Sequence, residues 1–170
     1  ETPIEVGRMR ELALGEDVLI VTAGITTEEA LRARAALAKA GLSVRHLHLN
    51  TIKPFDAAAL LDHIASVRYG VVTLENHVID GGIGSLVAEV MADNGIGKRL
   101  RRLGLRDTYA HGGSRSYLMR YYGLDALALV RGVPGAGAQD GVGAGRGAAA
   151  AAGGGAAAGD PPLAGGLDAG

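Results

Sequence analysis

The chain contains no cysteine, which excludes disulfide bonds, thiolate nucleophiles and thiolate metal ligands and agrees with a reducing compartment. It also lacks an apolar run long enough to cross a membrane, a recognisable signal peptide and any long run of charge of one sign. Because the net charge is −1, bulk electrostatics favour neither nucleic acid nor an anionic membrane as a partner. We therefore expect a soluble cytoplasmic protein.

The chain has 170 residues, of which 48% are apolar, and this is enough for one domain with a core of its own. It begins at Glu1 rather than at methionine, which indicates a processed, truncated or excised piece. From residue 132 to residue 170, 27 of the 39 residues are glycine or alanine. So few large apolar side chains do not offset the entropy of ordering the backbone. We predict a folded domain over residues 1–131 and a disordered, low-complexity tail over residues 132–170.

Within the predicted domain, short apolar runs alternate with helical patterns. The expected strands cover residues 18–21, 44–49, 71–74 and 99–105, and the expected helices cover residues 27–40, a segment after Asp56, residues 85–93 and a segment from Ser114 to Tyr121. Thr26 and Glu29 fit a capping box for the first of these helices, with Gly41 as its stop. This alternation predicts a parallel sheet with right-handed crossovers and helices on both faces, an α/β fold.

The most informative segment is residues 71–85, where an apolar strand leads through a charged turn into a glycine-rich helix start. Its glycines permit close approaches, and the first amides of the helix have no intrahelical partner. In open parallel sheets, ligands usually bind beyond the carboxyl ends of the strands, where this turn lies. The candidate site is an interdomain or anion-binding turn that comprises Glu75, His77, Gly81, Gly82, Gly84 and Ser85. In the structural alternative, the glycines only let the helix pack close to the sheet.

Several familiar sites are disfavoured at this turn. The spacing Gly81-Gly82-x-Gly84 differs from the dinucleotide fingerprint, and no lysine followed by serine or threonine closes the turn as in a P-loop. A hydrolytic triad of Ser85, His77 and Asp80 lacks the Gly-x-Ser-x-Gly elbow. The turn therefore does not predict nucleotide binding or hydrolysis.

Three further groups of polar residues lie outside the turn. His46 and His48 share one face of a strand, but no third ligand is evident, so we expect packing rather than metal binding; His63 should face solvent. A basic cluster surrounds a probable edge strand, either to block edge pairing or to bind a partner or phosphate, and consists of Lys98, Arg99, Arg101, Arg102 and Arg106. The polar loop from Tyr109 to Arg115 either faces a neighbouring domain or forms a helix entry turn.

The order of these motifs resembles the C-terminal domain of the transketolase family, in which a Glu-x-His motif leads into Gly-Gly-x-Gly-Ser, as from Glu75 to Ser85 here. Residues 17–24 resemble the first core strand of that domain, residues 51–56 the loop before its second helix, and residues 103–107 its last strand. Residues 122–124 complete the set. The resemblance is strongest to the C-terminal subunits of split transketolases.

The resemblance implies a three-layer αβα domain with a mostly parallel five-stranded sheet, in which residues 4–12 form an antiparallel edge strand. Enzymes of this family use thiamine diphosphate and Mg²⁺ to transfer a two-carbon ketol unit between sugar phosphates. The cofactor is held by a diphosphate-binding domain with a Gly-Asp-Gly motif and by a pyrimidine-binding domain. Neither domain is recognisable here, so we expect no cofactor, metal or catalytic residue in this chain alone. Its partners would be those two domains or subunits, and its role would be domain packing and dimerisation.

Two questions stay open at this stage. Deoxyxylulose-phosphate synthases and the beta subunits of 2-oxoacid dehydrogenases share the same third domain, so the substrate is not fixed. A stand-alone interaction or small-ligand-binding module that has kept the fold is the alternative from a different functional class.

Overall fold

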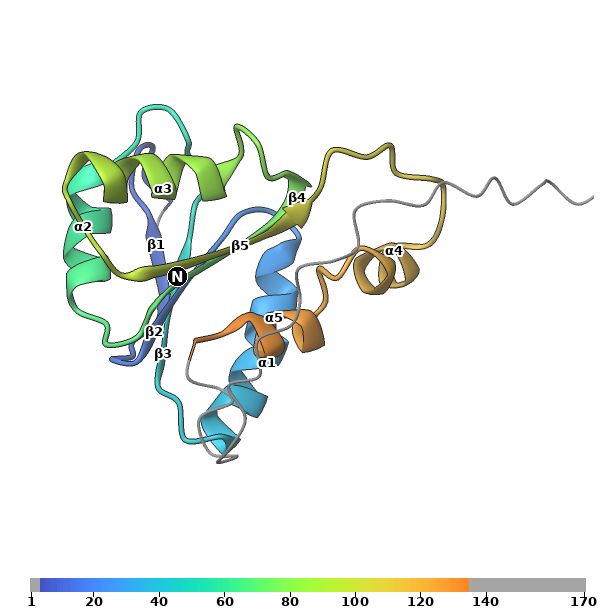
Figure 1. Cartoon of the computed structure of the whole chain (residues 1–170), viewed down its shortest axis with the longest axis horizontal. Coiled ribbons are helices and arrows are strands. Elements are labelled where there is room, and N and C mark those ends of the chain that lie inside the picture. The colour runs from blue at the N-terminus through green and yellow to red at the C-terminus, as the bar shows by residue number, and fades with distance from the viewer. Residues whose placement is uncertain (1–3, 135–170) are drawn as a thin grey trace, which may run out of the picture. The chain divides into compact units, whose positions relative to one another are not determined.

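The computed structural model describes residues 4–134, which form a five-stranded sheet with helices on both faces (Figure 1). The strands are β1 (Arg10–Ala13), β2 (Val18–Thr22), β3 (Val44–His48), β4 (Gly70–Val78) and β5 (Arg99–Leu105), in the spatial order β1-β3-β2-β4-β5. The helices are α1 (Thr26–Lys39), α2 (Ala57–Ala65), α3 (Ile83–Asp93), α4 (Arg115–Tyr121) and α5 (Ala126–Gly132). Only β1 is antiparallel to its neighbour, so the predicted mixed sheet is confirmed.

The alternation of side chains along the central strand builds two cores. Val18 and Ile20 of β2 point to the face covered by α1 and α5, whereas Leu19 and Val21 point to the face covered by α2 and α3. All four are fully buried, as expected for a strand with helices on both sides. Figure 1 shows α1 and α5 on one side of the sheet and α2 and α3 on the other, which confirms the three-layer architecture.

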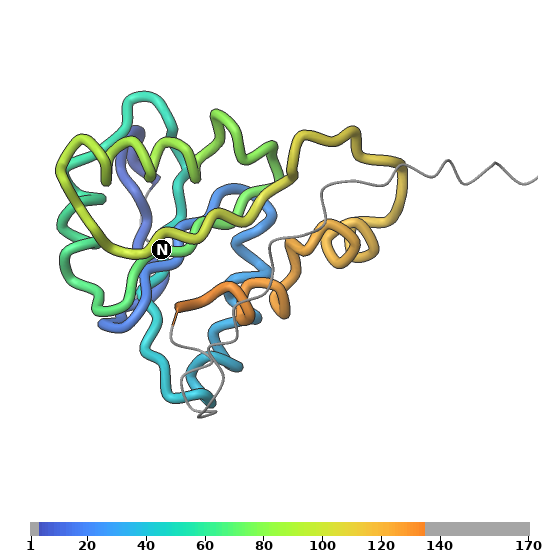
Figure 2. The backbone as a smooth tube through the Cα atoms, in the orientation of Figure 1, coloured from blue at the N-terminus to red at the C-terminus, as the bar shows by residue number. Residues whose placement is uncertain are grey.

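Two predicted boundaries are wrong. The edge strand begins at Arg10 rather than at residue 4, and its register against β3 shifts between Glu11 and Ala13. The predicted tail starts too early, because Gly132 belongs to α5 and Val133 is buried in the core. The rest of that tail, from residue 135 onward, lies outside the described residues and is drawn in grey in Figure 2.

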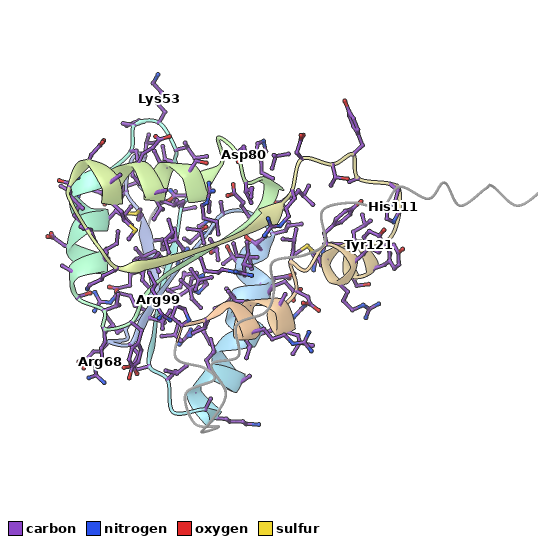
Figure 3. The ribbon with its side chains drawn as sticks, in the orientation of Figure 1. Lys53, Arg68, Asp80, Arg99, His111 and Tyr121 are labelled. Atoms are coloured by element: carbon purple, nitrogen blue, oxygen red, sulfur yellow. The ribbon has the colours of Figure 1, made fainter. Side chains whose placement is uncertain are left out.

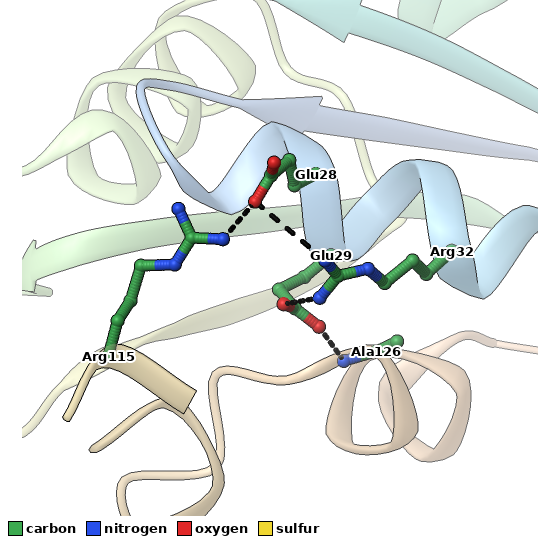
Figure 4. A network of polar contacts seen from close by, with 5 residues as sticks. All are labelled: Glu28, Glu29, Arg32, Arg115 and Ala126. Atoms are coloured by element: carbon green, nitrogen blue, oxygen red, sulfur yellow. Dashed lines mark hydrogen bonds and ion pairs between the residues drawn. The ribbon is translucent and has the colours of Figure 1, made fainter. Parts of the chain in front are cut away.

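The predicted capping box at α1 is also wrong. The residue before the helix is Ile25, and no side chain caps the helix there. Thr26 instead donates its hydroxyl to the carbonyl oxygens of Ala23 and Leu74. Glu29 accepts a hydrogen bond from the backbone N–H of Ala126 at 2.9 Å, and so caps α5 (Figure 4). Tertiary packing therefore uses both polar side chains non-locally.

Neighbouring contacts strengthen the junction between α1 and the C-terminal helices. Arg32 holds the other oxygen of Glu29 at 2.6 Å, and Arg115 pairs with Glu28 (Figure 4). Glu29 is nearly buried, whereas Glu28 is half exposed. The buried carboxylate is therefore the main polar link between α1 and α5.

Candidate functional site

The candidate site lies where the sheet changes direction of winding, at the carboxyl ends of β2 and β4. After β3 the chain crosses over β2 to form β4, which opens a crevice of the kind that binds ligands in open α/β sheets. The turn between β4 and α3, where Figure 3 labels Asp80, forms one side of it.

The turn is shorter than the sequence indicates. Strand β4 continues to Val78, so Glu75 and His77 lie in the strand, and α3 begins at Ile83, so Ser85 lies in its first turn. Between Leu74 and Val78 the register against β5 shifts, so the strand carries a bulge there. Bulges re-aim side chains, and this one directs Glu75 toward the start of α3.

Glu75 is the anion of this site. It is 3% exposed, and its two carboxylate oxygens accept hydrogen bonds from the backbone N–H groups of Ile83 at 2.8 Å and Gly84 at 3.0 Å. These amides begin α3, where the helix dipole favours a negative charge. The helix start that the sequence offered to an anion is therefore bound by a carboxylate of the chain itself.

The glycines make room for this carboxylate. A Cβ on Gly82 would overlap Oε2 of Glu75 and lie 2.6 Å from its Cδ. A Cβ on Gly84 would lie 2.8 Å from Oγ1 of Thr73, and one on Gly104, opposite the bulge, would lie 2.5 Å from Cγ2 of Ile79. Gly81 supplies the positive φ of 75° that the turn needs. Close packing of α3 against the sheet thus explains the glycine pattern.

Ser85 closes the turn and is not a nucleophile. Its hydroxyl donates to the carbonyl of Ile79 at 2.8 Å and accepts from the N–H of Gly81 at 3.0 Å and from Nη1 of Arg102 at 3.1 Å. The hydroxyl proton is therefore engaged. His77 donates from Nδ1 to the carbonyl of Val78 at 2.8 Å, not to Ser85, so the hydrolytic triad does not form.

A surface pocket of about 320 Å³ collects most of the predicted residues. It is lined by Ala23, Ile52, Glu75, Asn76, His77, Gly81, Gly82, Ile83, Ser85, Leu86 and Glu89, so Gly84 is the one candidate residue outside it. His77 is exposed, and its Nε2 is left free by the tautomer that donates from Nδ1. Ile52, which is 58% exposed, lines the same pocket.

A second, more apolar pocket of about 180 Å³ shares Asn76 with the first. It is lined by Ile25, Asn76, Leu105, Ala110, Arg115, Leu118, Met119, Tyr122 and Leu124. Sequence reasoning missed Ile25, Ile52 and Leu105, because a single apolar residue in a loop or at a strand end carries no signal of exposure. We call the surface formed by Ile25, Ile52, Asn76, His77 and Leu105 the carboxyl-end face.

The polar loop predicted from Tyr109 to Arg115 leads into α4, whose N-cap is Ser114, as expected. His111 lies beside three tyrosines of that helix and its end, with ring centroids 4.8 Å from Tyr121 and 5.6 Å from Tyr117. Figure 3 shows His111 and Tyr121 together at this end of the molecule. The hydroxyl of Tyr122 is 3.1 Å from Nδ1 of His111. An exposed aromatic cluster therefore borders the carboxyl-end face.

His46 and His48 do share a face of β3, where they pack under α1 and not around a metal. Nε2 of His46 is 2.9 Å from Oγ1 of Thr22, and Nδ1 of His48 is 2.8 Å from Oγ1 of Thr27. His46 is fully buried, and burial, with smaller contributions from Arg34 and His48, lowers its pKa to about 4. Sequence reasoning missed the two threonines.

Two other expectations concern groups away from the face. His63 is partly buried rather than solvent-facing, with Nδ1 3.1 Å from Nη1 of Arg45. Within residues 4–134, no three His, Asp or Glu side chains come together as metal ligands. In the same range, no helix has the length and apolar character to span a membrane.

Comparisons with known proteins decide the family. The family model described as transketolase, C-terminal domain, matches residues 7–129. The chain belongs to this family. A protein of Methanocaldococcus jannaschii described as a putative transketolase C-terminal section is 39% identical over 131 residues, which cover 77% of this chain and 40% of that protein. The family membership expected from the motifs is confirmed.

Other members of the transketolase family differ in their named activities. One of the subunits of an apulose-4-phosphate transketolase from Actinobacillus succinogenes is 37% identical and covered to 40% of its length by 73% of this chain. A 1-deoxy-D-xylulose-5-phosphate synthase of Syntrophotalea carbinolica is 38% identical and covered to 20% by 75% of this chain. The chain thus spans less than half the length of these relatives.

The fold agrees with a solved relative. The structure of a split-gene transketolase in its inactive beta4 tetramer superposes with a TM-score of 0.71 at 33% identity, covering 77% of this chain and 42% of the other. Assembly from several domains or subunits is therefore the rule among the named relatives.

Proposed function

We propose that this chain is the C-terminal, non-cofactor-binding domain of a thiamine diphosphate-dependent transketolase-type enzyme, which transfers a two-carbon ketol unit between sugar phosphates. The observation that carries the proposal is the Glu75 carboxylate on the first amides of α3. Because the chain's own anion occupies this helix start, a phosphate has no place there, and the turn is built for close packing. Together with the family match over residues 7–129, this supports a docking role at the crevice.

The described residues do not fit the cofactor of the complete enzyme. Its Mg²⁺ requires several oxygen ligands, and within residues 4–134 no three acidic or histidine side chains converge. The helix start that would bind a diphosphate is occupied by Glu75. We therefore assign thiamine diphosphate and Mg²⁺ to pyrimidine-binding and diphosphate-binding domains, in the same polypeptide or in a separate subunit.

The carboxyl-end face is the surface we assign to contact with those domains. Ile25 and Ile52 are 41% and 58% exposed, and each lines one of the two adjoining pockets. Exposed apolar residues beside polar groups such as Asn76 and His77 are typical of interdomain surfaces, which are more polar than a core. Glu75, His77, Gly81, Gly82, Gly84 and Ser85 thus shape an interdomain turn. We further propose that docking supports a dimer of the complete enzyme in the cytoplasm.

A second candidate has an observation in its favour. Relatives named 1-deoxy-D-xylulose-5-phosphate synthase are 35–38% identical to this chain, close to the identity of the transketolase subunits. The same docking role in a synthase of that kind is the alternative. Assaying the complete enzyme with ketose and aldose phosphates, and separately with pyruvate and glyceraldehyde phosphate, distinguishes the two.

The test uses the complete enzyme with and without residues 1–134. We expect thiamine diphosphate-dependent ketol transfer and stable assembly to be lost without this segment, and the chain alone to show neither activity nor cofactor binding by calorimetry. Full activity and unchanged assembly in its absence would refute the proposal. Cofactor binding by the chain alone would refute the assignment of the cofactor to other domains.

A further inference from the structure

A pocket of about 290 Å³ opens along β5, the strand at the free edge of the sheet. It is lined by Ile79, Arg101, Arg102, Leu103, Gly104, Arg106, Tyr122, Gly123, Ala128, Arg131 and Gly132. Three of its arginines come from β5 and the residue after it, and the fourth comes from α5. Two separate elements therefore bring four guanidinium groups to one concave site.

These guanidinium groups have no acidic partner among the described residues. The ion pairs of residues 4–134 use Arg8, Arg32, Arg45, Arg68 and Arg115, and none uses the four pocket arginines. No aspartate or glutamate of that range lines the pocket. Like charges gathered without counter-charges repel one another, so the site is electrostatically incomplete without an anion.

The basic cluster predicted from the sequence divides into different roles. Lys98 donates from Nζ to the carbonyl oxygens of Ile64, Ala65 and Val67 at 2.6–2.9 Å, and so stabilises the end of α2. Arg99, at the beginning of β5 (Figure 3), is exposed and does not line the pocket. Only the arginines that follow on β5 contribute to the concave site, so general basicity of the strand does not explain it.

The pocket is shaped as well as charged. Arg102 is partly buried and donates from Nη1 to Oγ of Ser85 at 3.1 Å, which holds that arginine in position. Leu103, Ala128 and Tyr122 give it apolar walls. The absence of a side chain at Gly132 leaves Leu103 accessible, since a Cβ there would lie 3.3 Å from Cδ1 of Leu103.

We propose that this edge pocket binds the phosphate group of a small phosphate monoester. Arginine forks match the oxygens of a phosphate and can bind it with paired hydrogen bonds. The volume is at the lower end of small-molecule sites, so it fits a compact ester and not a long polyanion. The apolar walls accommodate the carbon part of the ester. The site does not depend on the function proposed for the carboxyl-end face.

The test is an NMR titration of the full chain with ¹⁵N-labelled arginine, which reports each guanidinium through its Nε–H signal. Inorganic phosphate, glycerol phosphate and glycerol are added separately at constant ionic strength. We expect saturable shifts of the signals of Arg101, Arg102 and Arg131 with glycerol phosphate, binding at least as tight as with inorganic phosphate, and no response to glycerol.

Variants separate specific binding from bulk charge. Arg101→Gln and Arg131→Gln should each weaken binding about tenfold, because each removes a charge-assisted hydrogen bond. Arg99→Gln is the matched control on the same strand and should change the affinity less than about twofold. Shifts without saturation, or equal weakening by Arg99→Gln, would overturn the proposal. Binding of inorganic phosphate without binding of the ester would overturn the assignment of an ester.

Discussion

Replacing Gly82 by alanine tests whether the Glu75 carboxylate explains the glycine-rich start of α3. The backbone of Gly82 has φ −83° and ψ −169°, angles that alanine adopts without strain. The new methyl group would overlap Oε2 of Glu75, which is buried and bound to two amides. The carboxylate must move, so Gly82→Ala should disturb both hydrogen bonds.

The size of the effect follows from those bonds. A hydrogen bond to a charged group contributes about 1.5–3 kcal/mol, so displacing the carboxylate should lower the free energy of unfolding by about 3 kcal/mol. In a Glu75→Ala background the obstructing group is absent. There Gly82→Ala should cost less than about 1 kcal/mol, which is the weaker preference for alanine than for glycine before a helix. The coupling energy between the two positions is therefore about 2 kcal/mol.

Urea unfolding of all four proteins measures this coupling. Since the chain has no tryptophan, circular dichroism of the helices is the suitable signal. Gly97→Ala is the control, because nothing lies within 4 Å of a Cβ there, and it should change stability by less than about 0.5 kcal/mol. Equal costs of Gly82→Ala in both backgrounds would refute the steric account.

Three further predictions concern other parts of the chain. Because burial keeps His46 neutral and its pKa at about 4, the unfolded state gains the proton first on acidification; stability present above pH 6.5 should fall by about 3 kcal/mol at pH 4, and His46→Gln should lack this component in urea titrations at each pH. Glu29→Gln should cost about 1–2 kcal/mol in thermal unfolding, whereas Glu28→Gln should cost less than about 0.5; equal costs would contradict the capping of α5. Ile52→Asp should leave the unfolding midpoint of the chain unchanged yet weaken assembly of the complete enzyme about tenfold by sedimentation; unchanged assembly would exclude Ile52 from the interface.

The architecture could be predicted because local patterns agree with the tertiary structure. Strand β2 reads as a continuous apolar run since both of its faces are covered, and the caps Asp56 and Ser114 act on their own helices. The helix α5 was not predicted. Its small residues, beginning at Ala126, resemble the low-complexity segment that follows, and its stability comes from packing on α1.

The roles of the acidic residues could not be predicted for a different physical reason. Glu75 reaches α3 only because a bulge in β4 fits against Gly104 of β5, a strand that comes later in the chain. Glu29 caps a helix 97 residues away, although its local sequence fits a capping box. Local rules identify which side chains can cap a helix, but the sheet and helix packing decide which helix they cap.

Hydrogen exchange of this chain, free and bound to the cofactor-binding domains, is the most direct test of the docking role. The account predicts slower exchange at residues 23–25, at Ile52 and at residues 75–82 in the complex, with the amide of Gly84 already protected in the free chain by Glu75. Unchanged exchange across the carboxyl-end face in a complex that forms would contradict it.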